Sequence, residues 1–175
     1  MRDQMNIVLV GYRCCGKTTV GKILARKLNR SFVDTDGLIE ERESSSIEEI
    51  ISEKGWHYFR DIEKQVVREV SQNNKLVIGT GGGVVLDQDN VLNLIKNGWV
   101  VWLKADAEVL KERMEKDHSS GNVRPSLTGT NPIEEIREVL AVRMPLYEQA
   151  GDFAVDTGRD DPSAIADGII KEFGG

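Results

Sequence analysis

Hydrophobic residues gather in five short runs along the chain, and more polar segments separate these runs. The runs lie at 6–10, 31–36, 75–80, 99–105 and 152–157. Most of the segments between them carry apolar residues at helical spacing. Strands that alternate with helices are typical of a parallel sheet covered by helices on both faces. The pattern therefore predicts an α/β fold with three layers, α/β/α.

Two of the expected helices have clear starting signals. Ser46 and Glu49 have the spacing of a capping box, in which each residue bonds the backbone of the other. Asn131 followed by Pro132 supplies a cap and a first-turn proline. These signals predict helices that begin just after residues 46 and 131.

Residues 115–131, "EKDHSSGNVRPSLTGTN", lack sustained periodicity and are rich in Gly, Ser, Thr and Asn. Long irregular segments in compact domains are often lids over active sites. Arg124 would place a cation in the middle of such a lid. The alternative is a disordered excursion on the surface.

Composition limits the class of protein. The chain has 175 residues, 39% of them hydrophobic and 30% charged, which predicts a single domain spanning 1–175. A net charge of −6 argues against a protein that binds nucleic acid or a membrane surface. We find neither an apolar stretch of the roughly 20 residues that a membrane span needs nor a signal peptide at the start. We therefore expect a cytoplasmic location.

A phosphate-binding loop is the strongest motif. The segment "GYRCCGKT" matches G-x-x-x-x-G-K-[ST] through Gly11, Gly16, Lys17 and Thr18, between an apolar run and a segment with helical spacing. Glycines allow successive N–H groups to converge on a phosphate, and the helix directs its positive end at the same point. We expect Lys17 to reach the β- and γ-phosphates of a nucleotide and the Thr18 hydroxyl to bind Mg²⁺.

The two cysteines of the chain, Cys14 and Cys15, are adjacent within this loop. A disulfide between neighbours would be strained, so no disulfide framework is expected. One interpretation is that both are small reduced residues in a narrow loop. The other is that Lys17 and the helix start favour a thiolate, which would make the site sensitive to oxidants and alkylating agents.

Two aspartates follow the second apolar run. Asp34 and Asp36 lie two positions apart, so on an extended chain both side chains would leave the same face. At the carboxyl end of a strand, one can hold Mg²⁺ through water while the other orients or deprotonates a hydroxyl. The alternative is a helix cap plus a turn residue. "DTDG" also matches a guanine-nucleotide switch, but it follows the loop too closely and no N-K-x-D guanine reader is present.

The third apolar run ends in consecutive glycines, Gly81, Gly82 and Gly83, within "GTGGGVV". Bare backbone at the carboxyl end of a strand allows a ligand to approach closely. The alternative is a tight turn into the next helix.

Two arginines have neighbours that could position them, and their joint meaning depends on the rest of the chain. Arg60 lies one helical turn before Glu63, whose carboxylate can fix the guanidinium, and Arg143 precedes Pro145, which should kink or loosen its helix. A single arginine of this kind more often lies on a solvated face.

Taken together, the motifs resemble the shikimate kinase family over nearly the whole chain. The resemblance rests on the phosphate loop, "DTD" followed by "IE", "FRDIE", "GGGVV", "NVRPSL" at the lid position and "VRMPLY", in this order. It implies ATP-dependent phosphorylation of the 3-hydroxyl of shikimate, on the route to chorismate and the aromatic amino acids. It also implies the fold of nucleoside monophosphate kinases, with a parallel sheet in strand order 2-3-1-4-5, and a monomer.

The resemblance also implies residue roles. Arg60 and Arg143 would clamp the shikimate carboxylate, Asp36 and the backbone at Gly81, Gly82 and Gly83 would hold the hydroxyls, and Asp34 would serve Mg²⁺ with Thr18. Lys17, Asp36 and Arg124 would be catalytic. The implied nucleotide contacts are Gly11, Cys14, Cys15, Gly16, Lys17, Thr18, Thr19, Arg113, Arg124 and Pro162.

The sequence departs from the family at several places, since the family often has small residues at the positions of Cys14 and Cys15 and a glutamate at that of Trp56. Two other functions stay open: a kinase for another small acid or polyol such as gluconate, and a regulatory module that binds ATP without turnover. The set Lys17, Thr18, Asp34, Asp36 and Arg124 argues against the second.

Overall fold

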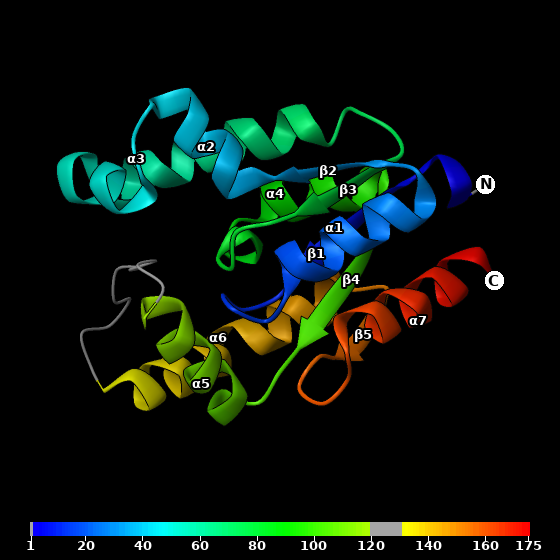
Figure 1. Ribbon diagram of the computed structural model, residues 1–175. Helices are drawn as coiled ribbons and strands as arrows, with labels where there is room; N and C mark the ends of the chain where they lie inside the picture. Colours follow the sequence, from blue (N-terminus) through cyan, green and yellow to red (C-terminus); the bar gives the residue numbers. More distant parts are fainter. Residues whose placement is uncertain (1, 120–130) are drawn as a thin grey trace.

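The computed structural model describes residues 2–119 and 131–175. Its centre is a five-stranded parallel sheet in the order β2-β3-β1-β4-β5 (Figure 1). The strands are β1 Asn6–Val10, β2 Ser31–Asp34, β3 Leu76–Gly79, β4 Gly98–Lys104 and β5 Phe153–Asp156. The ends of each strand agree with those of a predicted apolar run to within two residues. The predicted fold class and strand order are confirmed.

Helices connect the strands. They are α1 Lys17–Leu28, α2 Thr35–Glu43, α3 Ile47–Val70, α4 Gln88–Lys96, α5 Ala107–Ser119, α6 Pro132–Ala150 and α7 Pro162–Gly174, with short 3₁₀ segments η1 Arg2–Gln4 and η2 Val84–Leu86. The starting signals are confirmed: Ser46 and Glu49 form the capping box of α3, and the Asn131 side chain accepts from Ile133 N at the start of α6.

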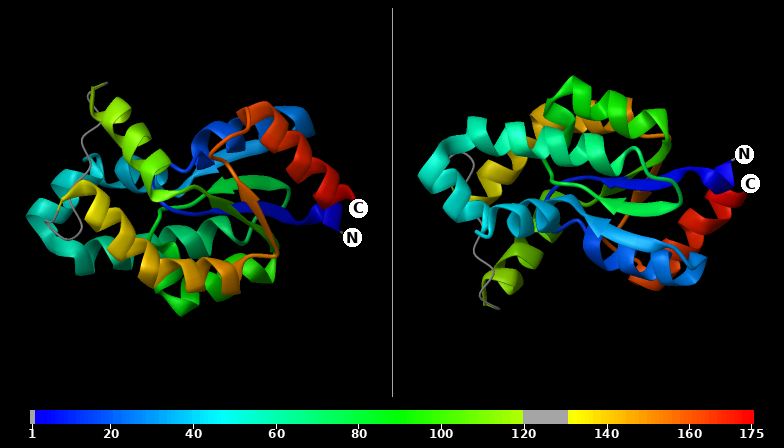
Figure 2. Two further views of the ribbon diagram at one scale, coloured as in Figure 1. Left: turned by 90° about the horizontal axis from the view of Figure 1, so that it is seen from below. Right: turned by 90° about the horizontal axis from the view of Figure 1, so that it is seen from above.

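The central strands are buried on both faces, and their alternating side chains divide the core in two. Ile7 and Leu9 of β1 pack in the cluster that includes α1 and α7. Val8 and Val10 point to the other side, into the cluster with α3 and α4. Figure 2 shows these helical layers on opposite faces of the sheet. Continuous apolar strands are what a sheet covered on both faces requires.

Two boundaries differ from the sequence predictions. β2 ends at Asp34 instead of residue 36, because Thr35 already begins α2. Residues 115–119, expected to be irregular, complete α5. The remainder of the predicted lid, 120–130, which contains Arg124, lies outside the described residues.

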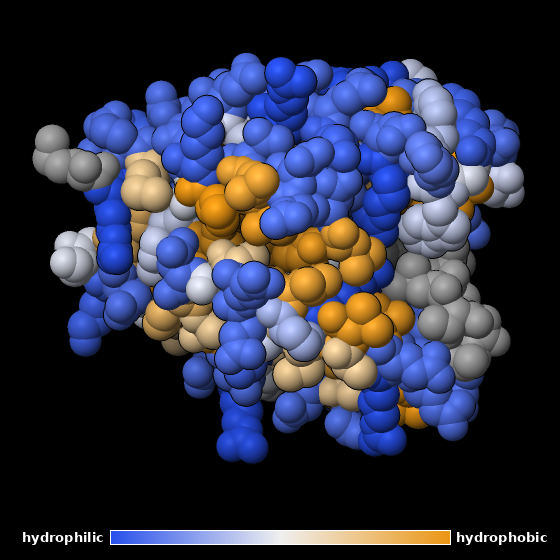
Figure 3. All heavy atoms as spheres, turned by 180° about the vertical axis from the view of Figure 1, so that it is seen from behind, coloured by the Kyte–Doolittle hydropathy of each residue, from blue (hydrophilic) through white to orange (hydrophobic). Residues whose placement is uncertain are grey.

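The helical layer behind the sheet carries an apolar surface. Figure 3 shows hydrophobic side chains gathered on this face. Among the described residues, the exposed large hydrophobic side chains outside α3 come from η2, α4 and α6: Leu86, Leu92, Ile95, Val142 and Met144. Within residues 2–119 and 131–175, no helix combines the length and apolar character that crossing a membrane requires.

Candidate active site

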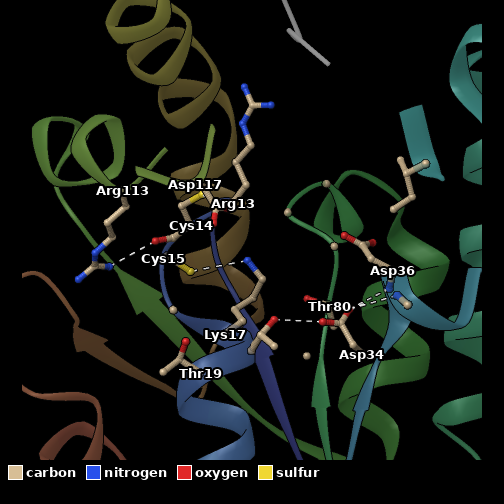
Figure 4. A pocket seen from close by; sticks show the side chains of 18 of the residues that line it. Arg13, Cys14, Cys15, Lys17, Thr19, Asp34, Asp36, Thr80, Arg113 and Asp117 are labelled. Atoms are coloured by element: carbon tan, nitrogen blue, oxygen red, sulfur yellow. Dashed lines mark hydrogen bonds between the residues drawn. The ribbon is translucent and has the colours of Figure 1, made fainter. Parts of the chain in front are cut away.

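A cleft of about 760 Å³ opens at the carboxyl ends of the strands. This is the edge at which open α/β sheets bind ligands, because the loops after the strands converge there. The phosphate loop, the starts of α2 and α3, the glycine segment after β3, and parts of α5, α6 and α7 line it. Figure 4 shows side chains from several of these segments facing the same space.

The phosphate loop has backbone geometry that its glycines allow. Gly11 has φ 145° and Gly16 has φ 106°, both in the region that L side chains rarely adopt. A Cβ at Gly11 would also lie 2.5 Å from the carbonyl oxygen of Leu103 and 2.8 Å from Cys15 Sγ. Gly16 then leads into α1, so that the N-terminal end of this helix faces the cleft.

Lys17 is the first residue of α1, and its side chain lies back over the loop. The Nζ atom donates to the carbonyl oxygens of Gly11, at 2.7 Å, and Tyr12, at 2.8 Å. The ammonium is therefore held inside the curve of the loop, where an anion bound to the loop would meet it.

Asp34 and Asp36 do not leave one face of an extended strand, which corrects the sequence prediction. The Asp34 side chain caps α2 by accepting from Asp36 N at 3.0 Å, and Asp36 already lies in the first turn of the helix. Asp34 Oδ2 also accepts from the Thr18 hydroxyl at 3.1 Å. The cap and the contact with the phosphate loop are thus made by the same carboxylate.

The glycine segment, residues 81–83, is in contact with charged side chains that come from α2, α3 and α6. A Cβ at Gly81 would lie 2.7 Å from Asp36 Oδ1 and 2.9 Å from Glu63 Oε1. A Cβ at Gly82 would be 3.4 Å from Arg143 Nη1, and one at Gly83 would collide with Arg60 Nη2. The absence of side chains here lets two carboxylates and two guanidinium groups approach a single stretch of backbone.

Arg60 and Glu63 form the ion pair expected from their spacing, with 2.6 Å between Arg60 Nη1 and Glu63 Oε2. The Glu63 carboxylate is buried, and Oε1 has no hydrogen-bond partner among the described residues. Burial raises the pKa of Glu63, while Arg60 and Arg143 oppose that increase. The Arg60 side chain is 26% exposed and lines the cleft.

Arg143 comes from α6 and is buried rather than solvated. One helical turn later, the hydroxyl of Tyr147 donates to the carbonyl oxygen of Gly82. Tyr147 is fully buried, and burial raises its pKa to a value at which the hydroxyl stays protonated. This hydrogen bond fixes the glycine segment against the helix that carries Arg143.

The sequence did not reveal a second contact of α6, which joins this helix to the phosphate loop. Arg13 in the phosphate loop forms a buried ion pair with Glu135 near the start of this helix. No motif marks either residue, and their separation of 122 positions hides the pair. α6 therefore contacts both the phosphate loop and the glycine segment.

The two cysteines lie in different environments. Cys15 is buried, and its Sγ lies 3.6 Å from Lys17 Nζ. Cys14 has φ 62° and lies at the edge of the cleft, where its Sγ is 3.7 Å from Asp117 Oδ2. Burial of Cys15 favours the interpretation of a small residue in a narrow loop.

Arg113 of α5 joins the phosphate loop to the segment after β5. Its guanidinium donates to the carbonyl oxygen of Cys14 at 3.3 Å, to Thr157 Oγ1 at 3.2 Å and to the Thr157 carbonyl oxygen. Thr157 Oγ1 in turn donates to the Cys15 carbonyl oxygen at 2.8 Å. Arg113 and Pro162 both line the cleft, as does Thr19.

A phosphate loop between β1 and α1, with Arg60 and Arg143 lining the same cleft at the carboxyl edge of the sheet, defines the class of P-loop kinases that act on small molecules. The sequence profile of one family of that class, shikimate kinase, matches residues 13–173. The chain belongs to the shikimate kinase family.

Individual relatives agree with this assignment. The chain is 44% identical to a shikimate kinase of Thermodesulfovibrio yellowstonii, over 96% of this chain and 94% of the relative. It is 40% identical to one of Syntrophus aciditrophicus, over 98% and 92%. A structure of shikimate kinase from Acinetobacter baumannii in complex with shikimate superposes with a TM-score of 0.90 at 33% identity, covering 98% of this chain and 93% of the other.

Proposed function

We propose that this protein transfers the γ-phosphoryl group of ATP to the 3-hydroxyl of shikimate, giving 3-phosphoshikimate and ADP. The observation that carries the proposal is the meeting of Arg60, Arg143 and Asp36 at the glycine segment, in the same cleft as the phosphate loop. Membership of the shikimate kinase family, and the likeness to a relative whose structure holds shikimate, support this acceptor.

The acceptor lies in the pocket between α2, α3 and the glycine segment. Arg60 and Arg143 bind its carboxylate, since planar guanidinium groups donate two parallel hydrogen bonds to a carboxylate. Asp36 and the backbone at Gly81, Gly82 and Gly83 bind the hydroxyl groups. Glu63 acts through Arg60, whose guanidinium it holds in place.

The nucleotide lies on the phosphate loop. The backbone from Gly11 to Gly16, including Cys14 and Cys15, binds the phosphates together with Lys17, Thr18 and Thr19. Lys17 then donates to phosphate oxygens in place of its two hydrogen bonds to loop carbonyl oxygens. Arg113 and Pro162 flank the adenine, on the side of the loop where Arg113 is hydrogen-bonded.

Thr18 and Asp34 fit a magnesium ion. Both offer oxygen atoms, which this ion prefers, and the two oxygens lie 3.1 Å apart beside the phosphate loop. Among the described residues no cluster of three or more His, Cys, Asp or Glu side chains can ligate a metal. A site with few protein ligands suits Mg²⁺, which keeps several waters and binds phosphate oxygens. When bound, Mg²⁺ neutralises charge on the β- and γ-phosphates.

In the transfer itself, the acceptor oxygen forms a bond to the γ-phosphorus while the bond from that phosphorus to the bridging oxygen of ADP breaks. Lys17 and Arg124 stabilise the charge that develops on the transferred group. Asp36 orients the hydroxyl and accepts its proton. No covalent enzyme intermediate is required, because positioning and electrostatics supply the catalysis.

ADP release from ATP and Mg²⁺ tests the proposal, with shikimate, gluconate, a set of nucleoside monophosphates, or no acceptor. We expect turnover with shikimate alone. Turnover only with another acceptor would retain the fold and reject the pocket assignment. ATP binding without turnover would place the protein in the regulatory class. We further propose that the chain acts as one domain, as a monomer and in the cytoplasm, and sedimentation of the purified protein tests its oligomeric state.

A further inference from the structure

One tryptophan of this protein lies in the cleft. Of the three tryptophans in the sequence, Trp99 and Trp102 are 4% and 6% exposed and belong to the core. Trp56 is 39% exposed and lines the cleft with Arg60. A large exposed indole beside a charged group in a binding cleft requires an explanation, because it gains little from packing while it stays in water.

The backbone places this indole by a break in α3. Gly55 leaves the helical conformation, with φ 82° and ψ 168°, and the helix resumes at Trp56. A positive φ of this kind favours glycine. In the second half of the helix, Phe59 and Arg60 follow Trp56 by three and four positions, and Glu63 follows Arg60 by three. The four residues therefore share one side of the helix, which borders the cleft.

The shared face encloses the Arg60 guanidinium. Its Cζ lies 5.5 Å from the centre of the Trp56 ring and 5.1 Å from that of Phe59. Both distances are within the range of a cation–π interaction. The two rings meet edge to face at 5.9 Å and 85°, and Glu63 binds the guanidinium at 2.6 Å.

We propose that Trp56 is a positioning residue for Arg60: its indole holds the guanidinium in the orientation that receives the acceptor carboxylate. This inference rests on the proposed function, in which Arg60 binds that carboxylate. A free arginine side chain loses rotamer freedom when it binds, so fixing it beforehand reduces the cost of binding. The indole also shields one face of the guanidinium from water, which strengthens its interaction with an anion.

The variants Trp56→Leu and Trp56→Phe test the role of the ring. Leucine keeps an apolar side chain but removes the aromatic face, whereas phenylalanine keeps the face. We expect Trp56→Leu to raise the KM for shikimate about tenfold, the size expected from a partly desolvated cation–π contact, with kcat and the KM for ATP unchanged. Trp56→Phe should retain most of the affinity. Leu92→Ala, at an exposed residue of α4 outside the cleft, is the matched control.

Equal KM values for shikimate in wild type and Trp56→Leu overturn the inference. An equal rise in this KM in Trp56→Leu and Trp56→Phe overturns it as well. If the wild-type protein does not phosphorylate shikimate, the proposed function fails separately. The contact between Trp56 and Arg60 is then tested without any substrate, by fluorescence. The emission of Trp56 is the difference between the spectra of wild type and Trp56→Phe. Arg60→Leu should shift this emission, and an unchanged spectrum overturns the contact.

Discussion

At the residue scale, Gly83 shows how much the acceptor pocket depends on a missing side chain. The Arg60 guanidinium occupies the space of a Cβ at this position, and Cζ would lie 2.8 Å from it. Such a distance cannot be tolerated, so one of the two groups must move. Since an arginine side chain is flexible, it is Arg60 that would be displaced.

Gly83→Ala should therefore raise the KM for shikimate by about tenfold or more, because one charged hydrogen-bond partner of the carboxylate is moved. ATP binding should not change, since the phosphate loop is not involved. Steady-state kinetics and calorimetric titration with an ATP analogue test this. The matched control is Gly168→Ala in α7, where no atom lies within 4 Å of the added Cβ. An unchanged KM in Gly83→Ala would mean that Arg60 does not bind the acceptor from its present position.

Glu63 gives the stability of the protein a pH dependence of known sign. Burial raises the pKa of Glu63 in the folded protein above the ordinary 4.5. The folded state therefore binds the proton of the Glu63 carboxyl more tightly than the unfolded state does. The contribution of Glu63 to stability is greatest below pH 4.5 and declines as the pH rises towards the raised pKa. Glu63→Gln should lack this decline. Urea unfolding of both proteins at several pH values tests it, and parallel stability profiles would contradict the assignment.

At the element scale, α6 links the two halves of the site. Glu135 near its start is paired with Arg13 of the phosphate loop, Arg143 lines the cleft, and the Tyr147 hydroxyl donates to the carbonyl oxygen of Gly82. The helix thus positions the residues proposed to bind the acceptor relative to the phosphate loop. Few of these contacts are visible in a sequence, because each joins segments far apart along the chain.

Removing one partner of the buried pair should destabilise the protein. Glu135→Gln leaves the Arg13 charge buried with a weaker partner, and we expect a loss of about 3 kcal/mol in the free energy of unfolding. The double variant Arg13→Met/Glu135→Leu removes both charges and should recover most of that loss. Glu138→Gln, at an exposed position of α6, should change stability by less than about 0.5 kcal/mol. Denaturant unfolding measures all three, and a double variant less stable than Glu135→Gln would contradict a coupled pair.

At the scale of the whole molecule, the nucleotide and acceptor parts of the cleft should bind their ligands separately. A ligand that binds only the folded state raises its stability, by about 2.7 kcal/mol at a hundred times the dissociation constant. Lys17→Met should abolish the increase in melting temperature caused by ATP while that caused by shikimate is kept. Thermal unfolding with each ligand tests this, and loss of both increases would mean that Lys17 also supports the acceptor pocket.

The sequence predicts the sheet well because its strands are continuous apolar runs between helices with clear ends. It also locates the phosphate loop, Arg60 with Glu63, and the glycine segment, since each is a local motif. The shared extended face predicted for Asp34 and Asp36 is wrong, because α2 already starts at Thr35, and Asp34 instead is the helix cap that the sequence offered as the alternative. It fails to find Arg13 with Glu135, and Tyr147 with Gly82, because tertiary contacts between distant segments leave no local pattern.

The contacts of α6 also limit how the length of this protein can vary among related sequences. Each residue added to an α-helix turns everything after it by about 100° and shifts it by about 1.5 Å. A single insertion between Glu135 and Arg143 would therefore point Arg143 and Tyr147 away from the glycine segment while the pair with Arg13 stayed in place. Single insertions and deletions should therefore be rejected in this stretch of α6.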